Sequence, residues 1–267
     1  MKRKTFLLVL LGFVVSFNAM AVPTTKKVIA HRGLSGTYPE NTMISFKRAL
    51  ETKAEFMELD VHLSKDNQVV VMHDEDLSRT TSGTGLIGNY PLTVLKTFSA
   101  GFSKKFAYKF YKEKIPTLLE VLKLIEKSPI YLLIEIKSHD KDAAYNERVG
   151  QVIYETVVKN YPQLKDRVAF ISFNVSILEK IRALDKTVRL GPIFNELPQE
   201  GSLADQALKL DTDVVIFSKK LLALQDVIEK IDQVKHFIYT VTPPEFSQVE
   251  KVDGLFGFAT DYADQID

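Results

Sequence analysis

Short apolar segments alternate with amphipathic segments along most of the chain. We interpret nine apolar segments as strands: Lys27–Ala30, Phe56–Leu63, Val69–Met72, Ile130–Ile136, Val168–Phe173, Val188–Phe194, Val214–Phe217, Phe237–Val241 and Leu255–Ala259. Six further segments carry apolar residues at helical spacing: Thr42–Thr52, Thr117–Lys127, Asp142–Lys159, Val175–Leu184, Leu203–Leu210 and Leu221–Ile231. Continuously apolar strands are typical of a parallel sheet that is buried on both faces. The pattern therefore predicts an α/β protein.

The second and third apolar segments are joined differently from the others. Only five polar residues, 64–68, separate them, which is too short for a parallel crossover and predicts an antiparallel hairpin. A symmetric turn centred between Asp66 and Asn67 would place Asp60 opposite His73 on one face. With one strand of this hairpin set aside, eight strands remain, and we predict a (β/α)8 TIM barrel.

A doubly wound α/β fold is the alternative. It would place a glycine-rich phosphate-binding turn after the first strand, where this chain has His31 and Arg32. The segment Gly83–Gly88 matches the dinucleotide-binding glycine pattern, but a polar segment, Arg79–Ser82, precedes it instead of a strand. We interpret Gly83–Gly88 as a loop, and the barrel remains the prediction.

The first 21 residues have the pattern of an export signal. A basic start at residues 2–4 is followed by the apolar stretch Phe6–Phe17 and by Ala19-Met20-Ala21, a small-residue cleavage pattern. The apolar stretch is shorter than the roughly 20 residues of a bilayer crossing. We predict a protein that is exported, either periplasmic or secreted, with no stable membrane insertion once residues 1–21 are removed. Residues 22–267 would then form a single barrel domain.

Composition narrows the function classes. The 267 residues have a formal net charge of +1, so no basic surface for nucleic acid is expected. The chain has no cysteine, which excludes disulfides, thiolate nucleophiles and thiolate metal ligands. Any metal site must therefore use oxygen or imidazole ligands.

Polar side chains gather where four consecutive strand segments end. These side chains are His31, Arg32, Glu58, Asp60, His73, Asp74, Glu135 and Lys137. In a barrel, catalytic groups come from the carboxyl ends of the strands, and residues two positions apart in a strand share a face. Burying three carboxylates is costly unless a cation neutralises them. We therefore predict one polar, cation-binding site at this end of the barrel.

These residues lie in motifs that closely resemble the signature of glycerophosphodiester phosphodiesterases. The motifs are HRG at 31–33, PENT at 39–42, ELDV at 58–61, VVMHD at 70–74, RTT at 79–81, IPTL at 115–118, IEIK at 134–137 and ISF at 171–173. The chain also keeps the closing Thr260-Asp261 of that family, but has Thr242 where the family usually has an asparagine.

The resemblance implies a fold, an activity and a set of site residues. It implies a (β/α)8 barrel with a small insertion after the His-Asp motif, at about residues 75–114. The implied site residues are the metal ligands Glu58, Asp60 and Glu135, the catalytic histidines His31 and His73, and the phosphate contacts Arg32 and Lys137.

Phosphodiester hydrolysis explains why these residue types would occur together. The anionic substrate needs its charge neutralised, a base for the attacking oxygen and an acid for the leaving alkoxide. Carboxylates suit one hard divalent cation, and we favour Ca²⁺ over Mg²⁺ because an exported protein meets calcium and three carboxylates tolerate its flexible coordination. Which histidine is the acid is left open. The nucleophile is water or the adjacent glycerol hydroxyl, and we favour the second, cyclic-phosphate route by analogy with barrels that cleave phosphoinositides.

We therefore predict metal-dependent hydrolysis of small-molecule glycerophosphodiesters, such as glycerophosphocholine or glycerophosphoethanolamine, to an alcohol and glycerol 3-phosphate. One alternative is a phospholipase D-like enzyme of the same barrel type that acts on lysophospholipid or sphingomyelin. Another is a catalytically silent protein that binds phosphorylated glycerol groups, although binding alone needs no pair of histidines. The head group and the oligomeric state are not predicted.

Other residues near the motifs are assigned structural roles. We place His62 on the face of its strand opposite to Asp60, and interpret His139 as structural. Glu40-Asn41-Thr42 is interpreted as a helix start capped by Asn41 or Thr42, with a contact between Glu40 and the site left open.

The insertion combines aromatic residues with lysines. The aromatic residues are Phe98, Phe102, Phe106, Tyr108, Phe110 and Tyr111, and the lysines are Lys104, Lys105, Lys109, Lys112 and Lys114. A substrate lid and a patch that touches anionic lipid are two interpretations. We favour a third, in which the aromatic rings pack on the barrel mouth and the lysines are solvated.

Overall fold

A computed structural model describes residues 24–139, 142–223 and 234–267. The predicted signal at 1–21 lies outside the described residues, as does most of the predicted helix at 221–231. Of that helix, only the end that overlaps a 3-10 turn, Lys219–Ala223, is described.

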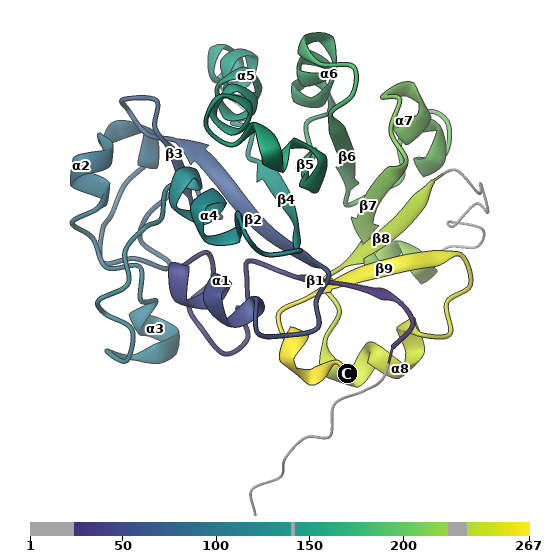
Figure 1. The fold of residues 1–267 in the computed structure, drawn as a ribbon, viewed down its shortest axis with the longest axis horizontal. Coiled ribbons are helices and arrows are strands. Elements are labelled where there is room, and N and C mark those ends of the chain that lie inside the picture. The colour runs from purple at the N-terminus through teal and green to yellow at the C-terminus, as the bar shows by residue number, and fades with distance from the viewer. Residues whose placement is uncertain (1–23, 140–141, 224–233) are drawn as a thin grey trace, which may run out of the picture.

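Nine strands form one sheet, and eight of them close into a barrel (Figure 1). The strands are β1 Lys27–Ala30, β2 Phe56–Leu63, β3 Val69–Val71, β4 Tyr131–Ile136, β5 Val168–Ser172, β6 Arg189–Phe194, β7 Val214–Ser218, β8 Lys235–Tyr239 and β9 Leu255–Thr260. The barrel strands are parallel, and β1 pairs with both β2 and β9, which closes the barrel. The predicted (β/α)8 TIM barrel is confirmed, and closure excludes the doubly wound alternative.

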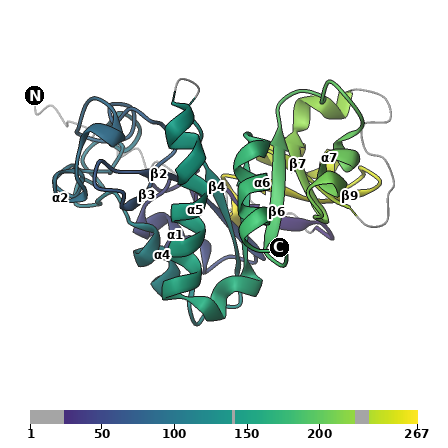
Figure 2. The ribbon, with the colours of Figure 1, turned by 90° about the horizontal axis from the view of Figure 1, so that it is seen from above.

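Helices lie outside the barrel, and most of them follow a barrel strand, whereas α2, α3 and α4 follow β3 (Figures 1 and 2). They are α1 Met43–Ala49, α2 Leu92–Leu95, α3 Ser103–Phe106, α4 Leu118–Ile125, α5 Ala143–Asn160, α6 Val175–Leu184, α7 Leu203–Lys209 and α8 Phe246–Val249. Short 3-10 turns occur at Ile87–Asn89, Pro162–Arg167, Lys219–Ala223, Pro243–Glu245 and Ala263–Gln265. Gly83–Gly88 forms no helix start of the dinucleotide-binding kind: residues 83–86 are a loop, and Ile87 and Gly88 begin the first of these turns.

The strands are buried on both faces, which explains their continuous apolar sequence. On β2, Met57, Leu59 and Val61 face outward into the main core that the helices cover. A separate, smaller cluster fills the inside of the barrel with residues such as Ile29, Ile171, Ile193 and Ile216. The inside is therefore apolar except where acidic side chains replace this layer.

The antiparallel pairing of β2 with β3 is confirmed, but the predicted register is wrong by one residue. Val61 pairs with Val71 and Leu63 with Val69, so Asp60 lies opposite Met72 rather than His73, and the Met72 N–H donates to the Asp60 carbonyl at 2.9 Å. Asn67 adopts a left-handed conformation with φ 56°, which makes a three-residue turn in place of the symmetric one. His73 lies two residues beyond the end of β3.

The segment between β3 and α4, at residues 75–114, contains α2 and α3 and contributes to a small hydrophobic cluster apart from the barrel core. This separate cluster is shared with the flanking chain and consists of Val70, Met72, Leu77, Ile87, Leu95, Ala100 and Ile115. Figure 1 shows α2 and α3 beside the barrel, away from α5, α6 and α7. Within the described ranges, no helix has both the length and the apolar character to cross a membrane.

Candidate active site

Three carboxylates from two neighbouring strands point into one end of the barrel. Glu58 and Asp60 lie on β2 and Glu135 on β4, with Asp60 directly beside Glu135 in the register. One carboxylate oxygen of each lies within 4.8 Å of the other two, and all three side chains are buried. In the described part of the chain, no other group of three histidine or acidic side chains comes as close. The structure thus brings together the three residues predicted as metal ligands.

Two cations lie against this cluster. Lys137 Nζ lies 2.8 Å from Asp60 Oδ1 and also pairs with Glu135 Oε1. Arg32 Nε lies 3.3 Å from Asp60 Oδ2, and the Arg32 backbone N–H donates to Glu58 Oε2 at 2.9 Å. When all three carboxyls are ionised, the cluster therefore keeps an excess of negative charge.

Burial and repulsion give the three carboxyls different pKa values. Burial, reinforced by Asp60 and Glu135, raises the pKa of Glu58 well above its usual value. Burial also raises the pKa of Glu135 to about 7 against the opposing effect of Lys137. Burial acts on Asp60 in the same direction, but Lys137 and Arg32 outweigh it and hold the Asp60 pKa well below its usual value. Two of the three carboxyls thus resist ionisation.

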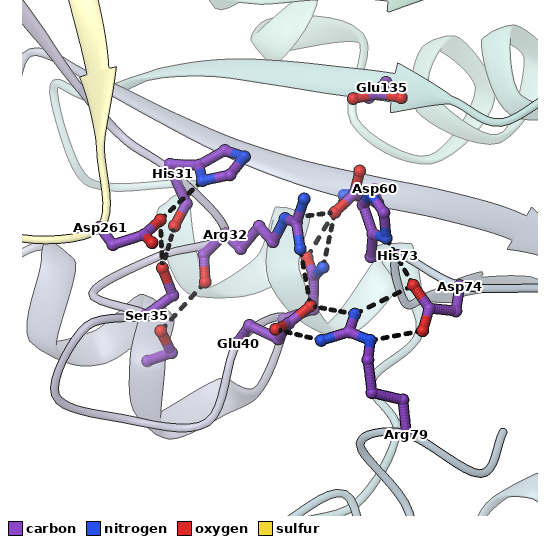
Figure 3. A network of polar contacts seen from close by, with 12 residues as sticks. His31, Arg32, Ser35, Glu40, Asp60, His73, Asp74, Arg79, Glu135 and Asp261 are labelled. Carbon is purple, nitrogen blue, oxygen red and sulfur yellow. Dashed lines mark hydrogen bonds and ion pairs between the residues drawn. The ribbon is translucent and has the colours of Figure 1, made fainter. Parts of the chain in front are cut away.

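His31 follows β1 at one side of the cluster (Figure 3). Its Nδ1 lies 2.7 Å from Asp261 Oδ1, and the Ser35 hydroxyl donates to the same oxygen at 2.9 Å. Its Nε2 lies 4.0 Å from Glu58 Oε2. Because Nδ1 is engaged, Nε2 is the ring nitrogen that faces the pocket.

His73 lies on the other side of Arg32 from His31 (Figure 3). Its Nδ1 lies 2.6 Å from Asp74 Oδ1, and Arg79 pairs with both oxygens of Asp74. Burial of Asp74 acts in the opposite direction, but hydrogen bonds from Arg79 and His73 lower the Asp74 pKa to about 2. Burial lowers the pKa of His73, and Lys137 adds to the effect. The Nε2 atom of His73 is again the nitrogen left for the pocket.

Glu40 connects the two arginines of the site. It accepts from Arg32 Nη1 at 2.8 Å, and from Arg79 Nη1 and Nη2 at 2.9 and 2.8 Å. Hydrogen bonds from Arg79, together with the charge of Arg32, outweigh burial and lower the pKa of Glu40. The contact between Glu40 and the site that the sequence left open is therefore present.

The turn after β1 explains why glycine follows the His-Arg pair. Arg32 and Gly33 both have left-handed backbones, with φ 55° and 77°. A Cβ on Gly33 would lie 2.5 Å from Ser45 Oγ and 2.8 Å from the Ser45 carbonyl carbon, so only glycine fits. In this left-handed turn, the Arg32 backbone N–H donates its hydrogen bond to Glu58.

Asn41 belongs to the site rather than to a helix cap. Its Nδ2 donates to Asp60 Oδ2 at 2.7 Å, and its Oδ1 accepts from the Asp60 N–H at 3.3 Å. Thr42 alone of the two predicted candidates caps α1, by accepting from the Ser45 N–H. The left-handed φ of 57° at Asn41 could not be derived from the helical periodicity that follows it.

The placement of His62 opposite to Asp60 was wrong. Residues two positions apart in a strand share a face, and His62 is buried behind the site. Its Nε2 lies 3.0 Å from the His73 carbonyl oxygen, and its Nδ1 lies 3.3 Å from His139 Nε2. Burial lowers the His62 pKa to about 4, so the neutral ring donates to that carbonyl and supports the chain at His73.

A cavity of about 190 Å³ opens onto both histidines, Arg32, Glu58, Glu135 and Lys137. Most of its other lining residues are apolar or aromatic and include Ile171, Phe173, Ile193, Ile216 and Tyr239, which we call the apolar wall. Phe173 and Tyr239 meet edge to face, with ring centroids 6.1 Å apart. Neither ring was expected in the site, although Phe173 lies in the ISF motif at 171–173 and both rings lie at or just after the end of a strand.

The donor set fits a hard divalent cation. All candidate ligand atoms are carboxylate oxygens, the ligands that Ca²⁺ and Mg²⁺ prefer. Glu58 Oε1 is buried and, within the described residues, has no hydrogen-bond partner. A cation at this position would satisfy that oxygen and relieve the repulsion that raises the pKa of Glu58 and Glu135.

Known proteins are similar to this chain in sequence and in fold. The model of the glycerophosphoryl diester phosphodiesterase family matches residues 31–242. A glycerophosphodiester phosphodiesterase of Caldanaerobacter subterraneus subsp. tengcongensis is 39% identical over 174 residues, which cover 62% of this chain and 66% of that protein. The YhdW protein of Bacillus subtilis (strain 168) is 33% identical over 245 residues, 90% of this chain and 96% of its own.

A solved structure gives a similar result. The phosphodiesterase of Oleispira antarctica, solved in complex with the product sn-glycerol-3-phosphate, has a TM-score of 0.79 and 31% identity. The superposition covers 90% of this chain and 94% of that one.

Proposed function

The chain belongs to the glycerophosphoryl diester phosphodiesterase family, and on this premise we propose that it hydrolyses glycerophosphodiesters to an alcohol and glycerol 3-phosphate with the help of a divalent cation. One observation carries the proposal. His31 and His73 stand on either side of Arg32 at the edge of the carboxylate cluster, each with a carboxylate at Nδ1. A pair of histidines in this arrangement suits acid–base catalysis rather than binding alone.

Glu58, Asp60 and Glu135 would hold the cation. When bound, it would polarise a phosphoryl oxygen and offset the charge that develops there. We favour Ca²⁺ over Mg²⁺, because three carboxylates on two strands tolerate variable coordination more readily than a strict octahedron.

Arg32 and Lys137 would bind the phosphate. Both line the cavity beside the carboxylates, and Arg32 offers a planar fork of donors where Lys137 offers a point charge. The phosphate would thereby be oriented between the two imidazoles.

The two imidazoles would move the protons at Nε2. One accepts the proton of the attacking oxygen as the new P–O bond forms. The other donates a proton to the leaving alcohol oxygen as the old P–O bond breaks. The attacking oxygen is that of water or of the neighbouring glycerol hydroxyl; we favour the hydroxyl, and detection of a cyclic glycerol phosphate during turnover would support that route.

A second candidate substrate class follows from the apolar wall of the cavity. Phe173 is 41% exposed and lies against Tyr239, so an acyl chain could contact this wall. This wall favours lysophospholipid or sphingomyelin as substrates of a phospholipase D-like reaction.

We also propose that residues 1–21 direct export and are removed, and that residues 22–267 act as one barrel domain in the periplasm or outside the cell. The basic, apolar and small-residue pattern of this stretch supports the proposal. Mass spectrometry of the protein after expression with its full N-terminus tests it. A new N-terminus at Val22 is expected, whereas an intact Met1 in the exported fraction would contradict it.

The activity is tested with purified protein and glycerophosphocholine. We expect release of choline and glycerol 3-phosphate that stops with a chelator and returns with Ca²⁺ or Mg²⁺. Turnover of long-chain lysophosphatidylcholine or sphingomyelin alone would support the second candidate. Binding of glycerophosphocholine without turnover in the presence of either cation would overturn both and leave a binding protein.

A further inference from the structure

The most exposed large side chains in the described part of the chain lie together on the insertion. Tyr108 is 82% exposed and Tyr111 is 57% exposed, more than any other large hydrophobic residue there. Four exposed lysines surround them in sequence: Lys104, Lys105, Lys109 and Lys112. We call these six residues the tyrosine–lysine surface.

The phenylalanines of the same segment hold this surface in place. Phe102, Phe106 and Phe110 pack edge to face, with centroids 6.2 and 5.4 Å apart, and Phe110 packs on Tyr38 at 5.6 Å. Phe102 and Ala107, at the two ends of α3, have left-handed φ values of 47° and 51°. These three phenylalanines therefore pack against one another and, through Phe110, against Tyr38. The predicted packing of the rings on the barrel mouth is wrong for Tyr108 and Tyr111, which are exposed.

The positive charge of this surface is not neutralised by acidic neighbours. None of its four lysines has a carboxylate within ion-pair distance among the described residues. Glu113, the one acidic residue between residues 98 and 114, accepts a hydrogen bond from the Ile44 N–H instead. Lys109 and Lys112 lie over aromatic rings of their own segment, Phe110 and Tyr111. The surface thus carries an excess of about four positive charges beside two exposed tyrosines.

The surface adjoins the loops that form the catalytic pocket. Lys105 Nζ donates to the Ser35 carbonyl at 2.9 Å, and Ser35 also contacts Asp261, the partner of His31. Arg79, which pairs with Asp74 on the His73 side, lies over the Phe102 ring at 5.6 Å. The tyrosine–lysine surface and the pocket therefore lie at the same end of the barrel.

We propose that the tyrosine–lysine surface docks the protein reversibly on anionic phospholipid membranes, with the catalytic pocket near the lipid surface. Tyrosine side chains are enriched in the headgroup region of membranes, because one end of the ring is apolar and the hydroxyl end can be hydrated. Lysines near an anionic leaflet each strengthen binding by about fivefold. The surface is too small for insertion, so the contact is peripheral and depends on salt.

Sedimentation with vesicles tests the proposal independently of catalysis. We expect the protein to sediment with vesicles that contain roughly one third phosphatidylglycerol in phosphatidylcholine and to remain in solution with phosphatidylcholine alone. Raising the salt from about 0.1 M to about 1 M should release it. Equal binding to both vesicle types, or no binding to either, would overturn the proposal.

Two matched double variants distinguish binding through this surface from a general effect of positive charge on vesicle binding. Tyr111→Ser with Lys112→Gln removes one ring and one charge, and should weaken vesicle binding by about tenfold or more. Leu208→Ser with Lys209→Gln makes a comparable change on α7, where Leu208 is 44% exposed, and should leave binding unchanged. Both variants should hydrolyse glycerophosphocholine as the parent protein does, which shows that they fold. Equal losses of binding in the two variants would overturn the proposal.

A soluble polyanion distinguishes a membrane from an acidic protein partner. Polyglutamate at a charge concentration equal to that of the phosphatidylglycerol should compete weakly, because it offers no headgroup region for the tyrosines. Complete displacement by polyglutamate would show a general polyanion surface and overturn membrane docking.

Discussion

The two histidine sides of the site have similar local geometry but are built differently. His31 and His73 each have an aspartate at Nδ1, at 2.7 and 2.6 Å. The partner of His31 is Asp261, 230 residues away in the sequence, and β9 delivers it when it pairs with β1 to close the barrel. The partner of His73 is the next residue, Asp74.

The charge around the two aspartates also differs. Asp74 is paired with the guanidinium of Arg79 from the insertion, whereas Asp261 receives a neutral hydroxyl from Ser35. One histidine therefore depends on barrel closure and the other on the insertion. The same histidine–aspartate contact is therefore formed by long-range packing at His31 and mainly by local contacts at His73.

The largest expected effect comes from removing either imidazole. His31→Asn and His73→Asn should each lower kcat for glycerophosphocholine by about 10²- to 10⁴-fold, because each removes one proton-transfer group. Initial rates measure the loss, and calorimetric binding of glycerol 3-phosphate to each variant checks that the pocket is intact. A loss of less than about tenfold for either histidine would remove it from the proposed acid–base pair.

The next effect tests the side that depends on barrel closure. Asp261→Asn keeps the size of the side chain but removes its charge, and should lower kcat by about 10- to 100-fold with little change in KM. Ser35→Ala, the control, removes only a hydroxyl from the same carboxylate and should have a smaller effect. An increase in KM at constant kcat would show that Asp261 shapes binding rather than the orientation of His31.

The carboxylate cluster between the two sides should bind its cation in a pH-dependent way. With a pKa of about 7, the Glu135 carboxyl is mostly protonated at pH 6, and the proton must leave when the cation binds. Affinity for Ca²⁺ should therefore be lower by about tenfold or more at pH 6 than at pH 8, and Glu58, whose pKa is also raised, should add to the difference. Calorimetry in two buffers measures both affinity and proton release.

Glu135→Gln is the control for this pH dependence. It removes one titrating group and should reduce the dependence while lowering the affinity at pH 8. If the parent protein binds Ca²⁺ equally at both pH values, Glu135 does not contribute a carboxylate to the cation.

The smallest effect tests the side that depends on the insertion. Arg79→Lys keeps the charge but loses the planar fork that bridges Asp74 and Glu40, and should lower kcat by about three- to tenfold. Arg48→Lys is the matched control, because Arg48 pairs with Glu51 on the exposed surface, and such pairs contribute little. Equal activity of both variants would mean that Asp74 holds His73 without help from Arg79.

Much of the fold was predictable because each barrel strand is buried on both faces. All nine apolar segments became strands, and the short polar connection at 64–68 correctly indicated the antiparallel hairpin. The register of that hairpin was not predictable from symmetry, because the left-handed Asn67 adds a residue to one side of the turn. The prediction that His62 faces away from Asp60 was wrong, although the sequence separation of two residues already places both side chains on one face of the strand.

The structure brings together the site residues that the motifs indicated, but several residues that hold them in place were not predicted. The three carboxylates, both histidines, Arg32 and Lys137 lie together, as the motifs implied. Asn41 was expected to cap a helix, and the motifs that contain Asp74, Arg79 and Asp261 did not indicate that these residues position the histidines. Asp261 reaches His31 only because the barrel closes, and Asn41 reaches Asp60 from a left-handed backbone. Neither property is expressed in hydrophobic periodicity.

The sequence by itself determined the alternation of strands and helices, and the residue types that meet at the carboxyl ends of the strands, since burial and side-chain direction follow from the pattern. Only the tertiary structure decided the partners of the site residues. It brought Asp261 to His31 by closing the barrel, and it turned Tyr108 and Tyr111 outward while Phe102, Phe106 and Phe110 packed inward. Such choices depend on which surfaces meet when the chain folds, and a linear pattern does not record them.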